Sequence, residues 1–259
     1  MASDRRRVRP LSEVSPELLR ESTDAITALI KERLPLQFEE GNLWGAVAHG
    51  FLARGGTLLE SLTLLVERGM EGEAQMILRT LFEHVTTFCW LAIDPEPHVE
   101  QWREWADSRR LKVHQDAKRF GIEVLTPAEV EQFKSAKPPL PLPQLAQKVD
   151  EHWSEVSTAF RPYEPGDPHI LTFSGFYTAV YRKASNLVHA DMVSVDRFMT
   201  MPLPRQATVH ASEKRSESND YPAFSVALMG FLLIVFEHHF SWPTRDLIDG
   251  ITDNLMYDD

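Results

Sequence analysis

The stretch FSVALMGFLLIVF, residues 224–236, contains no charged side chain and is the most apolar segment of the chain. Glu237, His238 and His239 follow it directly. A membrane-spanning helix needs about 20 predominantly apolar residues, so this run is too short to cross a bilayer. A helix that is apolar on all its sides belongs in a protein core. We therefore predict a buried helix over 221–240 at the centre of a protein that does not enter the membrane.

The other long segments show apolar residues at helical spacing and end at recognisable stop signals. No segment shows the strong alternation of apolar and polar residues that indicates a strand. Long helices are expected over 15–34, 43–68, 71–93, 96–120 and 172–189, and shorter ones from 126 onward and over 244–256. The sequence thus predicts an all-α fold, a single bundle of about six long helices packed around 224–236.

Local signals place several of these helix ends. Ser15 followed by Pro16 is a typical N-cap and first-turn pair. Gly69 is placed to end the second helix. The sequence Thr126-Pro-Ala-Glu129 has the spacing of a capping box, which opens a short helix.

The domain organisation follows from composition along the chain. Residues 1–12 form a basic tail that we expect to be flexible, and residues 13–259 form one all-α domain. KPPLPLPQ, residues 137–144, has four prolines and is expected to be a stiff extended connector. Residues 200–220 are polar and are expected to form a mobile loop. Two domains remain an alternative, because 259 residues fit either number.

Charge and cysteine content exclude some classes of protein. The chain has 27 Lys+Arg and 38 Asp+Glu, a net charge of -11, which opposes broad, non-specific binding of nucleic acid. Cys89 is the only cysteine, so an intramolecular disulfide and a multi-cysteine metal site are excluded. The basic start of the chain is not followed by the apolar run of a signal peptide. We expect a cytoplasmic protein, and phosphate-loop, dinucleotide and HExxH motifs are missing, so we expect no cofactor and no metal.

One face of the predicted 172–189 helix carries small and polar residues. At about 100° per residue, this face holds Arg182, His189, Ser185, Asn186 and Thr178. A solvated face normally carries Lys and Glu, so this composition indicates close approach by another element or by a ligand. The alternative is an ordinary helix interface with a satisfied histidine.

A second candidate group lies on the predicted 71–93 helix. Arg79 and Glu83 are four residues apart and therefore neighbours on a helix, with Trp90 flanking the same side. Such a pair either ties two helices together or lines a polar cleft. In the second case, Glu83 would hold an arginine or the His189 ring in position.

The predicted helix over 96–120 is locally basic. Its residues 102–120 combine tryptophans with the basic side chains Arg103, Arg109, Arg110, Lys112, Lys118 and Arg119. Basic residues interleaved with aromatic ones are able to follow a nucleic-acid backbone and stack on bases. We expect contact with RNA through residues 102–120, the alternative being a simply solvated face.

Two segments resemble a bacterial all-helical family of unknown function. The first is Glu60 to Arg119, with GMEGEAQMILRTLFEHVTTFCWLAIDPE at its centre, and the second is VYRKASNLVHADM, in which Ser185 and His189 follow a tyrosine. This resemblance implies a helical fold and brings no established activity.

The chain also resembles the HEPN-superfamily ribonucleases, whose signature is an arginine and a histidine with four to six residues between them. Four pairs have that spacing: Arg79/His84, Arg109/His114, Arg182/His189 and Arg205/His210. Only the seven-residue offset of Arg182 and His189 brings both side chains to one face of a regular helix. The family usually has a small polar residue or histidine directly after the arginine, where this chain has Lys183.

The HEPN resemblance implies a metal-independent endoribonuclease, a toxin or defence effector that acts as a homodimer. Arg182 would stabilise charge on a phosphate, and His189 would act as the general acid or base. Glu83 and Arg79 would complete the catalytic group, while Ser185, Asn186, Thr178 and Trp90 would bind substrate. Two alternatives stay open: a small-molecule enzyme or binding protein that uses the Arg79/Glu83/Arg182/His189 cleft, and a non-catalytic helical interaction protein.

Overall fold

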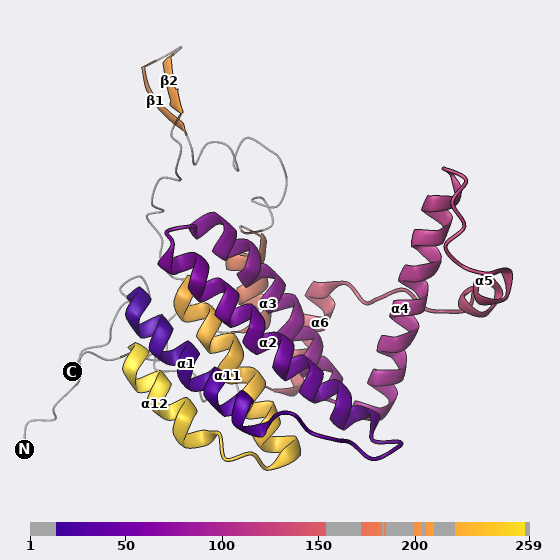
Figure 1. The fold of residues 1–259 in the computed structure, drawn as a ribbon, viewed down its shortest axis with the longest axis horizontal. Coiled ribbons are helices and arrows are strands. Elements are labelled where there is room, and N and C mark those ends of the chain that lie inside the picture. The colour runs from indigo at the N-terminus through magenta and orange to yellow at the C-terminus, as the bar shows by residue number, and fades with distance from the viewer. Residues whose placement is uncertain are drawn as a thin grey trace, which may run out of the picture.

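The computed structural model describes residues 14–153, 172–182, 184, 199–203, 206–209 and 221–256. Nearly all of its regular structure is helical, which confirms the helical fold. The bundle consists of α1 (Pro16–Arg33), α2 (Leu43–Glu67), α3 (Glu71–Leu91), α11 (Tyr221–Phe240) and α12 (Arg245–Met256). Figure 1 shows these helices side by side, with α11 running between the others.

Helix α11 is the core of the bundle, as predicted. Its side chains are buried from Tyr221 to Phe236 with the exception of Ala227. It packs against α1, α2, α3 and α12. Length and composition alone would allow this helix to cross a membrane, but 72% of its most apolar window is buried inside the fold. Its all-round apolar surface is therefore covered by neighbouring helices.

The approach of α2 to α11 is close because α2 carries a glycine there. A Cβ atom on Gly55 would lie 3.0 Å from Sδ of Met229. The predicted helix ends are also present: the Ser15 hydroxyl accepts the Leu18 amide, and the Thr126/Glu129 capping box is complete. Gly69 has φ +68° directly after α2, in the left-handed region that glycine adopts without strain.

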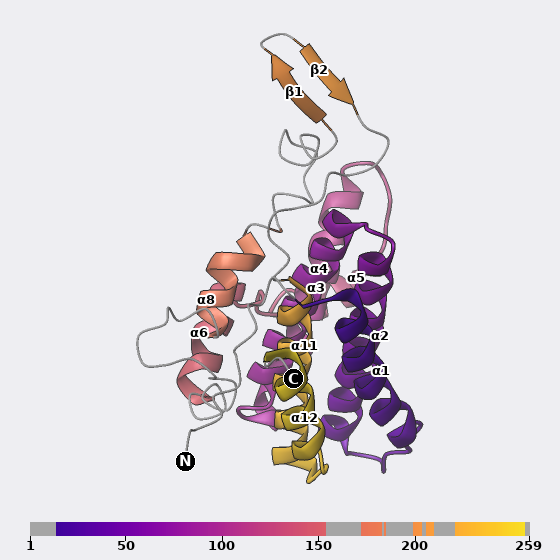
Figure 2. The ribbon, with the colours of Figure 1, turned by 90° about the vertical axis from the view of Figure 1, so that its left-hand side faces the viewer.

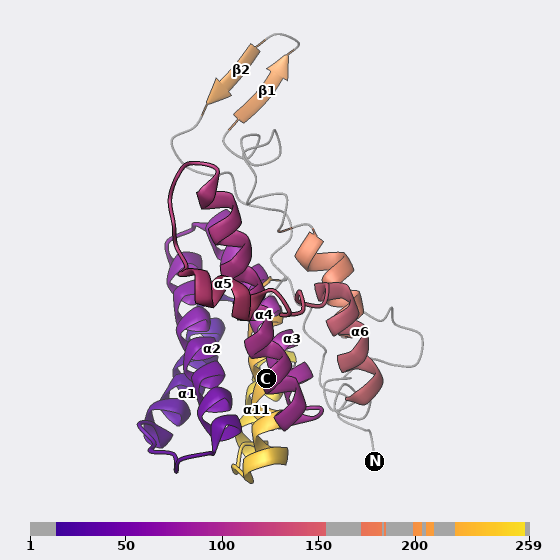
Figure 3. The ribbon, with the colours of Figure 1, turned by 90° about the vertical axis from the view of Figure 1, so that its right-hand side faces the viewer.

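Helix α4 (Pro95–Lys118) departs from the predicted single bundle. Its first part contacts α2 and α3, and its second part leaves the body together with α5 (Pro127–Phe133), as Figure 1 shows. In Figure 3, α4 and α5 face the viewer in front of the body. Only Val99, Trp105 and His114 of α4 are buried. The helix is therefore an arm with one end on the body.

The last third of the chain differs most from the prediction. Among the described residues, five helices have 18 or more residues (α1, α2, α3, α4 and α11), not six. The expected 172–189 helix starts as α8 (Phe173–Phe176) and continues as the π-helix η2 (Tyr177–Tyr181). Its residues 185–189 lie outside the described residues.

Residues 200–220 were expected to form an irregular loop, and part of this expectation is wrong. Strands β1 (Met199–Leu203) and β2 (Gln206–Val209) form an antiparallel pair that starts with Met199 opposite Val209. Each strand holds only four or five residues and β1 contains Pro202, so no long alternation marked them in the sequence. Residues 210–220 lie outside the described part, as does the expected tail over 1–12.

The expected connector over 137–144 is also shorter in the structure. Helix α6 (Leu142–His152) begins inside it. Pro143 lies in the first turn, where a backbone amide has no intrahelical acceptor, so the missing N–H of proline costs no hydrogen bond. Helix α6 packs against α3 and α8, and Figure 2 shows it beside α8. This arrangement places α8 and η2 over α3, where the candidate site forms.

Candidate functional site

An aromatic stack holds η2 against α3. Phe82 is fully buried, and its ring stacks on Phe176 with centroids 4.9 Å apart and planes 9° apart. Tyr181 lies against the same ring at 5.7 Å. Because Phe82 and Glu83 are adjacent in sequence, this stack brings the Tyr181 hydroxyl to the polar residues of α3.

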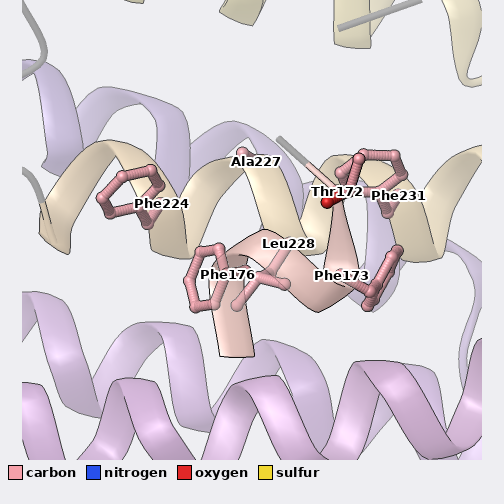
Figure 4. A pocket seen from close by; sticks show the side chains of 7 residues that line it. All are labelled: Thr172, Phe173, Phe176, Phe224, Ala227, Leu228 and Phe231. Atoms are coloured by element: carbon pink, nitrogen blue, oxygen red, sulfur yellow. The ribbon is translucent and has the colours of Figure 1, made fainter. Parts of the chain in front are cut away.

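Behind this stack, α8 meets α11 along an apolar seam, shown in Figure 4. The crevice there holds only about 10 Å³ and is lined by Thr172, Phe173, Phe176, Phe224, Ala227, Leu228 and Phe231. That is the room of about one water molecule, and water needs several polar partners to stay buried. The seam is packing that positions α8 and not a ligand site.

Arg79, Glu83 and Tyr181 form a polar network across the α3–η2 contact. The Tyr181 hydroxyl donates to Oε1 of Glu83 at 2.6 Å. Nη2 of Arg79 donates to the same hydroxyl at 2.9 Å and lies 3.1 Å from Oε1 of Glu83. The guanidinium carbon also sits 4.9 Å from the centre of the Tyr181 ring, within the range of a cation–π contact.

Burial and hydrogen bonding fix the protonation of this network. Burial raises the pKa of Tyr181, and the hydrogen bond to Glu83 raises it further, while Arg79 opposes both. Tyr181 is therefore a neutral hydroxyl that donates to the Glu83 carboxylate. The Arg79 and Glu83 side chains keep 28% and 43% of their surface exposed, so the network borders solvent.

Arg79 has hydrogen-bonding capacity that the network does not use. Its Nε atom is buried and finds no partner among the described residues. A guanidinium has five N–H donors in a fixed plane, and the network accounts for one nitrogen. Arg79 therefore combines an anchored end with free donors in the part of the chain that the structure describes.

The π-helix changes the face that we predicted around Arg182. The Arg182 amide donates to the carbonyl of Tyr177, five residues back, so each residue there turns less than the 100° of an α-helix. The position of Thr178 around the helix, predicted with 100° per residue, is therefore wrong. Its side chain is exposed and bonds the Ser174 carbonyl of its own helix, so it is not shown in a cleft. Arg182 itself is exposed, one residue after Tyr181.

Three predicted site residues, His189, Ser185 and Asn186, lie outside the described residues. Their expected roles, and the expected approach of Glu83 to His189, therefore stay predictions. The expected contact of Glu83 with Arg79 is present at 3.1 Å.

The prediction that Trp90 lines the cleft is wrong for the described structure. Its side chain is 1% exposed and stacks on His98 and Trp105, with ring centroids 4.1 and 4.7 Å away. Trp90 comes near the end of α3, where that helix faces the start of α4 and not η2. Thr86, on the same helix, is fully buried, and its hydroxyl has no hydrogen-bond partner among the described residues.

Tyr181 is the functional candidate that the sequence interpretation did not single out. It was counted only as the tyrosine that precedes the serine and histidine of the second family-like motif. Its position directly before Arg182 was a usable signal, since a tyrosine on an apolar helix face needs a polar partner for its hydroxyl.

The basic side chains of α4 are exposed, and several have acidic neighbours on the same helix. Arg103 pairs with Glu100 at 2.9 Å, and Arg119 lies 3.6 Å from Asp116. Such exposed pairs contribute little to stability. The described residues contain no group of three or more side chains placed to hold a metal ion.

Comparison with known proteins gives one match. Residues 45–204 match a family described as Family of unknown function (DUF5677), and this span includes Arg79, Glu83 and Tyr181. No curated protein and no solved structure matches the chain.

Proposed function

The chain belongs to this family of unknown function, whose matched span covers more than half of its length, and we propose that it is a HEPN-like, metal-independent endoribonuclease. The observation that carries the proposal is the Arg79–Tyr181–Glu83 network. It joins the two motif segments, and the exposed Arg182 directly follows Tyr181 in the chain. An exposed guanidinium at this position favours an anionic substrate such as a phosphodiester.

The network would serve as the rigid support of this site. The Tyr181 ring packs against Phe82, and its hydroxyl is hydrogen-bonded to Glu83 and Arg79. Arg182, the next residue, directly follows this anchored tyrosine. A group held in place in this way loses less freedom when it binds the transition state, which is how fixed donors accelerate phosphoryl chemistry.

The proposed reaction uses the 2′-hydroxyl of the RNA. His189 as a general base would take the 2′-hydroxyl proton while the 2′-oxygen bonds to phosphorus and the bond to the 5′-oxygen breaks. A protonated acid would return a proton to the leaving oxygen, giving a 2′,3′-cyclic phosphate and a 5′-hydroxyl. Arg182 would stabilise the charge on the phosphate oxygens, and Ser185 or Asn186 would orient the phosphate.

RNA contact along the basic residues 102–120 is a separate part of the proposal. Several arginines there have carboxylate neighbours, so the remaining local excess of positive charge would have to attract the RNA backbone. The proposal also places the protein in the cytoplasm, as a homo-oligomeric toxin or defence effector.

A non-catalytic interaction protein is the second candidate. It is favoured by the way Arg79, Glu83 and Tyr181 bond to one another, because such a network between two elements is typical of a tie between helices. The two candidates differ in whether the His189 segment performs chemistry.

Incubation of the full chain with 5′-labelled single-stranded RNA, with and without EDTA, tests the proposal. The parent protein is expected to cut RNA in both conditions, and His189→Ala to lose cleavage with unchanged helical circular dichroism. His210→Ala is the matched control, since Arg205 and His210 have a similar spacing in the sequence. A folded parent that leaves RNA intact would establish the non-catalytic candidate, and cleavage that survives His189→Ala would overturn the catalytic role of His189.

A further inference from the structure

The tip of the α4–α5 arm exposes apolar side chains. Phe120 is 82% exposed, and Val113, Ile122 and Val124 are each more than half exposed. Most large apolar side chains on a soluble protein are scattered singly, and a cluster of them marks an interaction surface. We call Val113, Phe120, Ile122 and Val124, with the neighbouring Lys118 and Arg119, the arm tip.

The arm tip has an ordered backbone. Gly121 turns the chain at φ +74°, and the buried His114 accepts the amides of Val124 and Leu125 on Nδ1 at 3.3 and 3.1 Å. The capping box of α5 follows immediately. The apolar side chains therefore project from a fixed turn, which lowers the entropy cost of binding.

The arm is positive, although the chain as a whole is negative. Residues 109–137 contain seven basic and four acidic side chains, a net charge of +3, while the chain carries -11. A partner that covers the arm tip would therefore combine an apolar surface with negative charge.

This chain has such a surface on its other side. Helices α1 and α12 border a groove of about 240 Å³ lined by Leu18, Glu21, Ser22, Ala25, Asp246, Leu247, Gly250, Ile251 and Asn254. Its apolar residues come from both helices, and its two charged residues, Glu21 and Asp246, are acidic. Small-molecule sites usually hold about 300–1,000 Å³, so the size suits one anchoring side chain better than a cofactor.

We propose that the arm tip of one chain docks into the α1–α12 groove of a second copy. Phe120 enters the groove as the aromatic anchor, and Lys118 and Arg119 face Glu21 and Asp246. Figures 1 and 2 show α1 and α12 on one side of the molecule and the arm on the other, so a chain does not reach its own groove. Because each copy has one tip and one groove, mutual docking closes a two-fold dimer.

A second copy fits the arm tip better than RNA does. Phosphate groups would neutralise Lys118 and Arg119, but they leave Val113, Ile122 and Val124 in water. The groove offers both apolar contact and negative charge. This proposal does not depend on ribonuclease activity, and the RNA contact proposed for residues 102–120 remains compatible with docking of the tip.

Sedimentation velocity of the full chain over a range of concentrations tests the dimer. The parent is expected to dimerise, and more weakly at high salt, because part of the attraction is between exposed charges. Phe120→Asp is expected to raise the dimer dissociation constant about tenfold or more, as the loss of a central aromatic anchor does. Leu36→Asp, which changes an apolar residue with 47% exposure outside both surfaces, is expected to dimerise like the parent.

A charge exchange tests which surfaces meet. Lys118→Glu with Arg119→Glu is expected to weaken the dimer, and so is Glu21→Lys with Asp246→Lys. All four changes in one chain are expected to restore it. Equal weakening without restoration would show that the two surfaces do not face each other, which overturns the proposal.

Engineered cysteines give a second measurement that does not depend on affinity. Cys89 is buried and burial raises the pKa of its thiol, so it does not compete. Under mild oxidation, a mixture of Phe120→Cys and Ala25→Cys chains is expected to form a covalent dimer between the two variants. A parent that is monomeric at every concentration overturns the proposal. If Phe120→Asp then weakens RNA binding, the arm tip is assigned to RNA instead.

Discussion

The Tyr181 hydroxyl donates to Oε1 of Glu83 over 2.6 Å, joining two segments that are 98 residues apart in the chain. This bond, together with the one from Arg79, ties α3 to the segment that carries Arg182. A hydrogen bond to a charged group contributes up to about 1.5–3 kcal/mol when it is well buried. Partial exposure of Glu83 reduces the expected contribution to about 1 kcal/mol.

Tyr181→Phe should therefore lower the free energy of unfolding by about 1 kcal/mol, measured by urea titration. Tyr177→Phe is the matched control. Tyr177 stacks on Tyr181 at 5.1 Å, but its hydroxyl has no hydrogen bond to a described residue. If both variants lose the same free energy, the hydroxyl network does not stabilise the α3–η2 contact.

Part of this site was predictable. Arg79 and Glu83 were expected to be neighbours because residues four apart always are on a helix, and caps at Ser15 and Thr126 follow from local hydrogen bonding. Tyr181 was not predictable as their partner, since its position depends on a π-turn and on the stack with Phe82. Periodicity assumes a regular helix and says nothing about which distant element faces it.

The errors at Trp90 and α4 have the same physical origin. A helical wheel placed Trp90 beside Arg79, but the wheel does not show that α4 covers the end of α3. It also does not show that α4 continues beyond the body. Val113 is an apolar residue at helical spacing, like a core residue, and yet it is exposed.

Trp90→Ala is expected to cost about 3–5 kcal/mol of stability, as the removal of a buried aromatic side chain does. Urea titration measures this loss, and Trp90→Phe should lose less because it keeps a ring between His98 and Trp105. Any RNA cleavage per folded molecule should be unchanged in Trp90→Phe. A specific loss of cleavage in a stable Trp90→Phe protein would return Trp90 to the substrate site.

Stability should fall on acidification below about pH 6.5 because buried histidines resist protonation. Burial lowers the pKa of His84, His49 and His239 in the folded chain. Below pH 6.5 the histidines of the unfolded chain bind protons that those of the folded chain do not bind. The contribution of the neutral histidines to the free energy of unfolding is therefore complete above that pH, and it is lost as the pH falls through their lowered pKa values.

His84→Gln isolates one of these groups. His84 Nε2 lies 2.7 Å from the Phe51 carbonyl, and a glutamine amide keeps a donor there without a titrating ring. The variant should lose less stability than the parent between pH 7 and pH 5, measured by urea titration at each pH. Identical acid dependence in the two proteins would show that His84 is not one of the responsible groups.

Gly50→Ala is expected to raise the free energy of unfolding by about 0.5–1 kcal/mol, because alanine loses less backbone freedom in a helix than glycine. Gly50 is exposed inside α2, and no atom lies within 4 Å of an added Cβ. Gly55→Ala is the control: its Cβ would lie 3.0 Å from Sδ of Met229, so contact with α11 should offset the gain. Equal stabilisation of both would mean that α2 and α11 are not closely packed at Gly55.

Arg182→Lys tests the proposed phosphate contact separately from stability. Arg182 is exposed, so its replacement should leave the urea midpoint unchanged. Lysine keeps the charge but lacks the planar pair of donors that grips two phosphate oxygens, so the RNA cleavage rate should fall about 100-fold at saturating RNA. Arg205→Lys, the arginine of the other late Arg–His pair, should cleave like the parent. A loss of RNA affinity with an unchanged cleavage rate would assign Arg182 to substrate binding alone, and parental values for both would remove it from the site.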